Sequence, residues 1–357
     1  MIEKLTKKQR EIFATYPIAI LVFFGFLVSV SVYVHQIYMQ PVADHTEKVI
    51  VQSDPKIQQE KQQRVQEILA KQNDATARVI YQPIKNKNAQ DLAVENAHAA
   101  IVLDAESGTI LWQKNATEKR SLASITKLVT AMVVIDRMRD LNEVVTIPES
   151  VMGIEGTKVG CPTSVICNSP RLYPGEKVRI KDLLSAMLMY SANDAATVLG
   201  MHVAGSEEEF AILMNARMKE LGAGNTHFCR PSGLELDVNE ESCYSSAYDI
   251  ARVMAHLLQH DKYDVLWEIM RTDETTFSSV DGSVTHELKN TDRLIGGMSN
   301  LVGAKTGFTP RAGYCLALAA SDPSGKHHVV TVVLDDYHRF DDVEMMSAWA
   351  FANYTWQ

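Results

Sequence analysis

The segment from Ile12 to Val34 contains no charged residue, and from Ile18 onward it is almost wholly apolar. Roughly 17–20 such residues in a helix rise about 25–30 Å, which is enough to cross the hydrocarbon core of a membrane. Four basic residues and only two acidic ones precede the segment. By the positive-inside rule, we expect a cytoplasmic tail at residues 1–11 and a single transmembrane anchor at residues 12–35.

A cleaved signal peptide is the alternative interpretation of this segment. The apolar run is longer than a usual signal core, and the sequence after it offers no clear small-x-small cleavage site. We therefore favour an uncleaved anchor in the cell membrane. In either case the body of the chain lies outside the cytoplasm, on the periplasmic or cell-wall side.

Residues 36–93 have the composition of a stalk. Between Pro41 and Asn96 there is no Gly, Phe or Trp, Tyr81 is the only Phe, Tyr or Trp, and glutamines crowd one part of the segment. Such a stretch cannot bury enough apolar surface to form a domain. The formal net charge of the whole chain is −9, without a dense basic run beyond the N-terminus. Nucleic acid is therefore not an expected partner.

We expect one globular domain at residues 94–357. Within Ala100–Gln113, two apolar runs are split by Glu-Ser-Gly, which is typical of a β-hairpin. Helical patterns follow at Lys181–Val203 and Glu207–Leu221. Strand patterns end the domain, at Tyr314–Ala320 and His328–Leu334. Strands at both ends of a helical middle predict a sheet in which the first and last strands meet.

The five cysteines form no CxxC motif and no Cys/His spacing typical of zinc. In an oxidising compartment, proximity alone suggests the pairs Cys161–Cys167 and Cys229–Cys243, with Cys315 left single. In a reducing compartment all five would be small core residues. His256 and His260 have the spacing of two metal ligands on one helix face, but no third ligand is evident, so we expect no metal.

Ser124 and Lys127 form an S-x-x-K motif before the apolar run Leu128–Ile135, which we expect to be a buried helix. Positions i and i+3 share a helix face, so the hydroxyl and the amine come within hydrogen-bond reach. Lysine can activate a serine nucleophile if burial, a helix N-terminus or a second cation lowers its pKa from about 10.4. The alternative is an N-cap serine with a surface lysine, although a cation there opposes the helix dipole by about 0.3–1 kcal/mol.

Two further motifs follow in order. Ser191-Ala192-Asn193 separates two helical patterns, and by itself it is explained by helix capping, since Ser and Asn are favoured cap residues. Lys305-Thr306-Gly307 precedes a strand, and a glycine there would let a peptide lie alongside the backbone. Each motif is weak alone, but the three in this order and setting form a strong signal.

With these motifs the sequence resembles the low-molecular-mass penicillin-binding proteins, the serine D-alanyl-D-alanine carboxypeptidases and endopeptidases of peptidoglycan. The likeness covers about residues 95–357. It extends to the segments Leu122–Asp136, Leu172–Ala196, Asn225–Leu234, Tyr244–Ala251, Lys305–Cys315 and Trp349–Tyr354. The resemblance implies an α+β fold of the β-lactamase/transpeptidase type, an antiparallel sheet flanked by helices with a mostly helical subdomain.

The resemblance also implies a role for each motif residue. Ser124 would attack the substrate carbonyl, Lys127 would take its proton, and Ser191 would pass protons to the departing amine. Substrate binding would fall to Asn193, Lys305, Thr306 and Gly307, and the backbone N–H groups of Ser124 and Phe308 would form the oxyanion hole. Arg311 is a further candidate for carboxylate binding.

The implied partners are peptidoglycan stem peptides, with β-lactams as covalent inhibitors and no cofactor. A serine β-lactamase shares all three motifs, but no Glu-x-x-Leu-Asn segment follows Asn193. A non-enzymatic sensor of β-lactams or of the wall is the other alternative. The sequence leaves open whether a free D-Ala-D-Ala end or a cross-link is preferred. The chain stops about 50 residues after the Lys305 motif, which resembles the shorter, endopeptidase-like members.

Overall fold

The computed structural model describes residues 81–163, 166–235 and 242–357. The expected cytoplasmic tail, transmembrane anchor and most of the stalk lie outside the described residues. Among the residues that are described, we find no helix that combines the length and the apolar character needed to cross a membrane.

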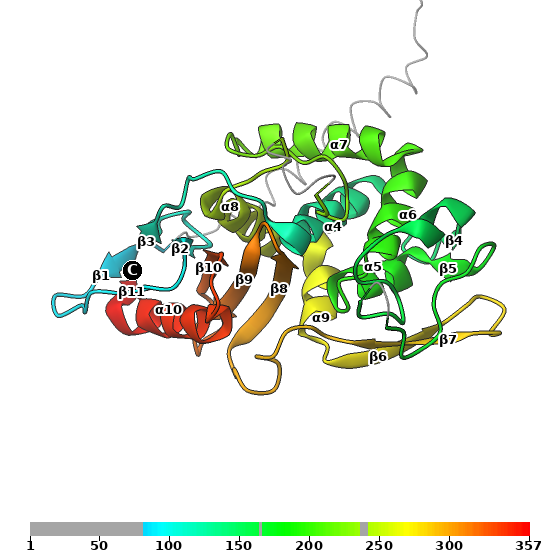
Figure 1. Ribbon diagram of the computed structural model, residues 1–357. Coiled ribbons are helices and arrows are strands. Elements are labelled where there is room, and N and C mark those ends of the chain that lie inside the picture. Colours follow the sequence, from blue (N-terminus) through cyan, green and yellow to red (C-terminus); the bar gives the residue numbers. More distant parts are fainter. Residues whose placement is uncertain (1–80, 164–165, 236–241) are drawn as a thin grey trace, which may run out of the picture. The chain divides into compact units, whose positions relative to one another are not determined.

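A five-stranded antiparallel sheet forms the centre of the domain (Figure 1). Its order is β3-β2-β10-β9-β8, with the strands at Ile110–Lys114, Ala99–Asp104, His328–Leu334, Gly313–Ser321 and Leu301–Thr309. β2 and β10 come from opposite ends of the domain sequence and pair along six residues, which confirms the predicted meeting of the first and last strands. β2 and β3 form the predicted hairpin.

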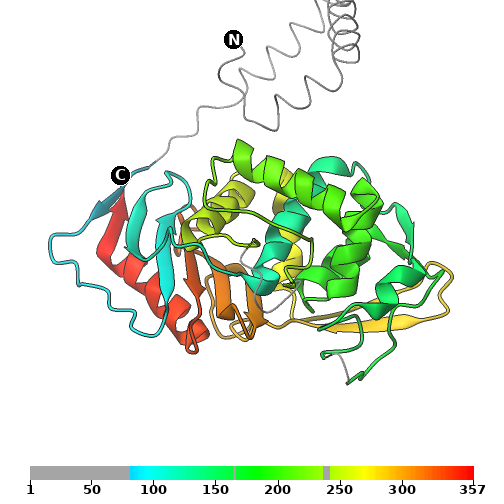
Figure 2. The ribbon, with the colours of Figure 1, turned by 45° about the horizontal axis from the view of Figure 1, so that its top comes forward.

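Helices cover both faces of the sheet, so its middle strands are almost entirely buried. α8 (Ala247–Leu258) packs on one face and α10 (Arg339–Asn353) on the other, where Figure 2 shows α10 in red beside the orange strands. The helix α9 (Asp264–Arg271) packs against β8 and α5. Two short 3₁₀ turns lie at η3 (Glu149–Gly153) and η4 (Asp261–Tyr263).

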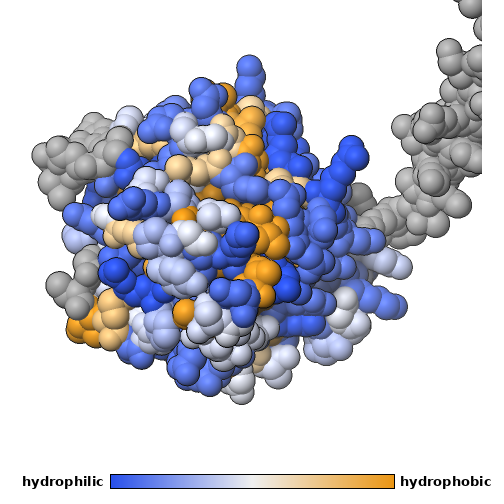
Figure 3. All heavy atoms as spheres, turned by 90° about the vertical axis from the view of Figure 1, so that its right-hand side faces the viewer, coloured by the Kyte–Doolittle hydropathy of each residue, from blue (hydrophilic) through white to orange (hydrophobic). Residues whose placement is uncertain are grey.

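A mostly helical subdomain lies beyond the β8 edge of the sheet (Figure 1). Its helices are α4 (Lys127–Arg137), α5 (Ile180–Leu188), α6 (Asn193–Ala204) and α7 (Glu207–Glu220). Two small antiparallel sheets accompany them: β4 (Val144–Thr146) pairs with the distant β5 (Lys177–Arg179), and β6 (Glu274–Ser278) forms a hairpin with β7 (Thr285–Lys289). The end of this subdomain is largely hydrophilic, with hydrophobic side chains gathered in a stripe (Figure 3). Most apolar side chains of these helices are instead buried in one core.

The strand β1 (Pro83–Lys85) pairs with β11 (Tyr354–Trp356) at the end of the described chain. This pairing extends the globular part toward the N-terminus, beyond the start at residue 94 that the composition predicts. The reason is that a short edge strand needs only backbone hydrogen bonds, which leave no apolar signal in the sequence.

The cysteine pairs suggested by proximity are confirmed. Disulfides join Cys161 to Cys167 and Cys229 to Cys243, and Cys315 is a buried free thiol. His256 and His260 pack ring against ring, 4.2 Å between centroids, and His256 Nε2 lies 2.8 Å from the Arg217 guanidinium.

Candidate active site

Ser124 lies on a 3₁₀ turn, η2 (Ala123–Thr126), which leads directly into α4. The α-helix begins only at Lys127, three residues later than Ser124. In a 3₁₀ turn the side chains at i and i+3 eclipse each other, which brings Lys127 Nζ to 2.7 Å from Ser124 Oγ. Ala123 has a positive φ of 48°, a strained conformation for a residue with a side chain. The turn therefore presents a partly exposed hydroxyl against a lysine in contact with it.

Two glycines allow the backbone to close around this turn. A Cβ at Gly307 would lie 2.7 Å from the Leu122 carbonyl oxygen, so the residue must lack a side chain. Gly233, with a φ of +77°, approaches the Ala123 carbonyl from another segment in the same way. Because of these close approaches, β8 and the segment around Gly233 both support the turn that carries Ser124.

Lys127 is fully buried, and its amine has three oxygen neighbours. Besides Ser124 Oγ, these are Asn193 Oδ1 at 2.8 Å and the Ser232 carbonyl at 2.7 Å. Both carbonyl oxygens can only accept, so a neutral amine donates its two hydrogens to them and directs its lone pair at the Ser124 hydroxyl. Burial, and after it the positive charge of Lys305, hold the pKa of Lys127 well below its usual range. The amine is thus arranged as a base for Ser124.

Ser191 and Lys305 meet on the other side of the site. Lys305 Nζ is buried and donates to Ser191 Oγ at 3.0 Å and to the Thr306 carbonyl at 3.1 Å. Burial, and next the positive charge of Arg339, lower the pKa of Lys305 to about 7. Ser191 occupies the bend between α5 and α6 with a φ of 65°. Because its oxygen accepts from Lys305, its own proton can be donated to a group bound in the site.

Asn193 begins α6 and holds two parts of the site together. Its Oδ1 accepts from Lys127, and its Nδ2 donates to the Glu155 carbonyl at 2.9 Å. The next residue, Asp194, accepts from the Val159 amide with both carboxylate oxygens at 3.2 Å. Burial raises the pKa of Asp194 to about 6. The start of α6 therefore fixes the segment 155–159 next to the base.

Thr306, Gly307 and Phe308 lie on β8, which is the outer strand of the sheet in the described part of the chain and pairs with β9. Thr306 Oγ1 is 2.6 Å from Thr291 Oγ1, and Phe308 is half exposed. The close packing of Gly307 on residues 122–125 sets the peptide of Phe308 beside the Ser124 turn. An outer strand with its free edge at the nucleophile can pair with an extended peptide.

The structure brings together every motif residue assigned from the sequence: Ser124, Lys127, Ser191, Asn193, Lys305, Thr306 and Gly307. It adds two groups that sequence reasoning missed. The Ser232 carbonyl contacts Lys127, and Arg339 Nη1 donates to the Gly307 carbonyl at 2.7 Å. A backbone carbonyl has no sequence signature, and Arg339 is distant in sequence from every motif. Arg311 lies half-buried in the turn between β8 and β9.

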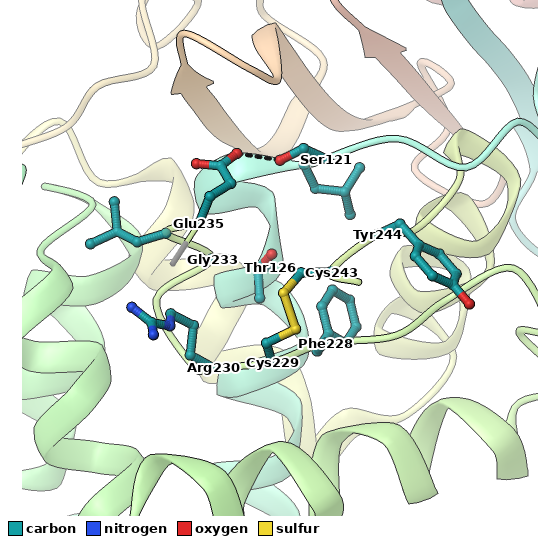
Figure 4. A pocket seen from close by; sticks show the side chains of 11 residues that line it. Ser121, Thr126, Phe228, Cys229, Arg230, Gly233, Glu235, Cys243 and Tyr244 are labelled. Carbon is teal, nitrogen blue, oxygen red and sulfur yellow. Dashed lines mark hydrogen bonds between the residues drawn. A yellow bond between two sulfur atoms is a disulfide. The ribbon is translucent and has the colours of Figure 1, made fainter. Parts of the chain in front are cut away.

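A separate pocket lies beside the Ser124 turn (Figure 4). Ser121 and Thr126, on either side of Ser124 in sequence, line it together with the Cys229–Cys243 disulfide, whereas Ser124 itself does not. Ser121 donates a hydrogen bond to the Glu235 carboxylate at its edge. This pocket therefore belongs to the packing that supports the turn and contains neither the hydroxyl nor the base.

Comparison with known families gives one extended match. The family model described as D-alanyl-D-alanine carboxypeptidase, Peptidase_S11, matches residues 85–338. The D-alanyl-D-alanine carboxypeptidase DacF of Bacillus subtilis is 32% identical over 275 residues, 75% of this chain and 65% of that protein. The D-alanyl-D-alanine endopeptidase of Pseudomonas aeruginosa is 32% identical over 255 residues, 70% of this chain and 76% of that protein.

Solved structures show the same fold. Penicillin-binding protein D2 of Listeria monocytogenes, in its ampicillin-bound form, is 30% identical with a TM-score of 0.60, covering 73% of this chain and all of that one. A D-alanyl-D-alanine carboxypeptidase of Mycobacterium tuberculosis is 26% identical with a TM-score of 0.64, covering 75% and 96%. The chain spans 65% and 61% of the length of two of the carboxypeptidases that it matches.

Proposed function

Because the chain belongs to the D-alanyl-D-alanine carboxypeptidase family of serine peptidases, we propose that it hydrolyses D-alanyl-D-alanine bonds of peptidoglycan stem peptides through an acyl-enzyme on Ser124. The observation that carries this proposal is the buried Lys127 amine, held by two carbonyl oxygens with its third neighbour the Ser124 hydroxyl. That arrangement is a serine nucleophile with an adjacent base.

The acylation step follows from these contacts. Neutral Lys127 takes the Ser124 proton as Oγ attacks the carbonyl of the penultimate D-alanine. The backbone N–H groups of Ser124 and Phe308 stabilise the oxyanion, and losing one such donor typically costs about 2.7–4 kcal/mol. The Ser191 hydroxyl gives a proton to the departing amine and takes one from Lys305, 3.0 Å away, as the C–N bond breaks. Water later hydrolyses the ester; its proton returns to Lys305 through Ser191, and Lys127 returns its own to Ser124 Oγ. Lys305 and Thr306 bind the terminal carboxylate of the substrate, and Asn193 Nδ2 contacts its peptide.

The experiment that tests this function supplies the full-length chain with a D-alanyl-D-alanine stem peptide and, separately, with benzylpenicillin. We expect release of D-alanine from the peptide and a drug adduct on Ser124 that lasts minutes to hours, followed by intact mass. Fast drug turnover with no lasting adduct would identify a β-lactamase instead. An adduct without any peptide hydrolysis would identify a sensor.

The activity should depend on pH with a maximum near neutrality. Protonated Lys127 cannot accept the serine proton, so kcat/KM rises with pH through the lowered pKa of this amine. Neutral Lys305 loses its attraction for the carboxylate, so kcat/KM falls as pH rises through about 7. Lys305→Arg keeps the cation and should move the alkaline limb to higher pH. A pH–kcat/KM profile that stays flat from pH 7 to 9 in the wild type would contradict this assignment.

We also propose that residues 12–35 anchor the chain in the cell membrane and that it acts in cell-wall remodelling. The support is the charge-free apolar run with its preceding basic residues, which lies outside the described residues. The full-length chain is expected to stay with the membrane fraction after washing with alkaline carbonate and to leave it in detergent. Recovery of a shortened chain in the soluble fraction would support the cleaved signal peptide.

A further inference from the structure

We propose that Arg339 is a positioning residue for the oxyanion hole: it holds the peptide between Gly307 and Phe308 so that the Phe308 N–H points at the substrate carbonyl. This inference rests on the proposed function and names a further side chain on which its oxyanion hole depends. Arg339 lies outside all three motifs, 32 residues after Gly307. Its assignment comes from its contacts in the folded chain.

Arg339 is the first residue of α10 and reaches the backbone of two strands beside the site. Its Nη1 donates to the Gly307 carbonyl at 2.7 Å and to the Cys315 carbonyl at 3.1 Å. Gly307 and Cys315 are register partners in the pairing of β8 with β9. The guanidinium therefore joins the two strands where Gly307 packs on the turn that carries Ser124.

Aromatic rings fix the guanidinium in addition to these carbonyls. Its Cζ lies 5.1 Å from the centroid of the Tyr314 ring and 5.0 Å from that of Phe340. A guanidinium within about 6 Å of a ring centroid is attracted to the face of the ring. The rings of Phe308 and Tyr314 are in turn 4.4 Å apart. Arg339 is therefore a fixed support in direct contact with the residues around the oxyanion hole.

The geometry of a peptide unit carries this support to the N–H group. The unit is planar and trans, so its carbonyl oxygen and its N–H point in opposite directions. The Gly307 carbonyl and the Phe308 N–H belong to one such unit, and fixing the oxygen on Arg339 fixes the direction of the N–H. The packing of Gly307 on residues 122–125 sets how far this unit lies from the nucleophile. Direction and distance of the donor thus come from two separate contacts.

Arg339 also makes the Phe308 N–H a stronger donor. A hydrogen bond from a charged donor is about twice as strong as a neutral one, and it polarises the peptide that accepts it. A polarised N–H stabilises the negative oxygen of the transition state better than an unperturbed one. The guanidinium is always protonated in proteins, so this effect does not change with pH.

The charge of Arg339 acts on a second group of the site. Burial, and next the charge of Arg339, lower the pKa of Lys305 to about 7, whereas Asp292 opposes them. Lys305 contacts Ser191 Oγ, and its own charge lowers the pKa of Lys127. Removing the charge of Arg339 should raise the pKa of Lys305. The alkaline limb of the kcat/KM profile should then move to higher pH, which a loss of packing alone would not cause.

The test uses the full-length chain and benzylpenicillin with and without a heavy-isotope label on its β-lactam carbonyl. Arg339→Met keeps a long side chain and removes the charge and the donors. We expect acylation to slow about 10–100-fold, less than the 10²–10³-fold that is typical when an oxyanion donor is removed. In the infrared difference between the two acyl-enzymes, the ester carbonyl band should move to higher frequency, because a weaker hydrogen bond leaves the C=O bond stiffer. Arg339→Lys keeps a cationic donor and should recover part of both effects.

Arg252→Met is the matched control, because Arg252 makes the same kinds of contact on α8. Its Nη1 donates to the Gly222 carbonyl at 2.9 Å, and its guanidinium lies 5.7 Å from the centroid of the Tyr248 ring. Neither residue contacts a motif residue in the described part of the chain. The control should keep the wild-type acylation rate, carbonyl band and pH profile.

The outcomes separate this inference from the proposed function. An unchanged carbonyl band in Arg339→Met overturns the inference even if acylation slows, because Arg339 would then only stabilise the fold. An acylation rate within about threefold of wild type also overturns it, as does an equal loss in Arg252→Met. If the wild type forms no adduct at all, the proposed function itself fails and the inference fails with it.

Discussion

Replacing Ser124 by alanine is expected to abolish both the benzylpenicillin adduct and the hydrolysis of stem peptides. The substitution removes the atom that forms the ester in the proposed reaction, and removal of a serine nucleophile elsewhere costs on the order of 10⁶ in rate. The hydroxyl is partly exposed and contributes one hydrogen bond to Lys127, so the free energy of unfolding should change by only about 1 kcal/mol. Intact mass after drug treatment and a thermal melt measure the two effects.

Ser324→Ala is the matched control, because Ser324 is exposed in the turn between β9 and β10, where its hydroxyl donates to the Asp322 carboxylate. It should acylate and hydrolyse like the wild type. A drug adduct of unchanged extent in Ser124→Ala would show that another residue is the nucleophile, and the proposed function would then be wrong.

Replacing Lys127 by methionine is expected to lower the acylation rate by about 10²–10⁴-fold or more, the usual contribution of a positioned base. Methionine has a similar shape without the amine, so the fully buried position stays filled. The rate constant for benzylpenicillin acylation measures the effect directly. Lys219→Met on the exposed side of α7 is the matched control. An acylation rate within tenfold of wild type in Lys127→Met would exclude Lys127 as the base.

The pH dependence of the free energy of unfolding tests independently whether the buried Lys127 amine is neutral. The unfolded chain binds a proton at Lys127 below about pH 10.4, whereas burial keeps the folded amine neutral to a much lower pH. The unfolded state therefore binds more protons in this window, and wild-type stability falls as the pH is lowered from about 10 toward the folded pKa. Lys127→Met should lack this part of the pH dependence. The melting temperatures of the two proteins are measured between pH 7 and 10. If both change with pH by the same amount, the buried amine is not neutral.

Much of the fold could be predicted from local pattern. Apolar runs in the sequence predicted the β2–β3 hairpin, the buried helix after Ser124 and the closing strands. Each of these patterns depends only on the side-chain periodicity of a single helix or strand. The pairing of Cys161 with Cys167 followed from proximity in sequence alone. The anchor at residues 12–35 and the roles of the site residues in the reaction stay predictions.

The sequence by itself determined which side chains to expect at the site, since Ser124 and Lys127 are close along one turn and the other two motifs have their own local signatures. Only the tertiary structure decided the state of those side chains. The lowered pKa of Lys127 depends on complete burial and on the charge of Lys305. The direction of its amine depends on Asn193 and Ser232, which lie 66 and 105 residues away along the chain. Spacing along the chain reports neighbours within a turn, whereas burial and pKa are set by contacts that only folding brings together.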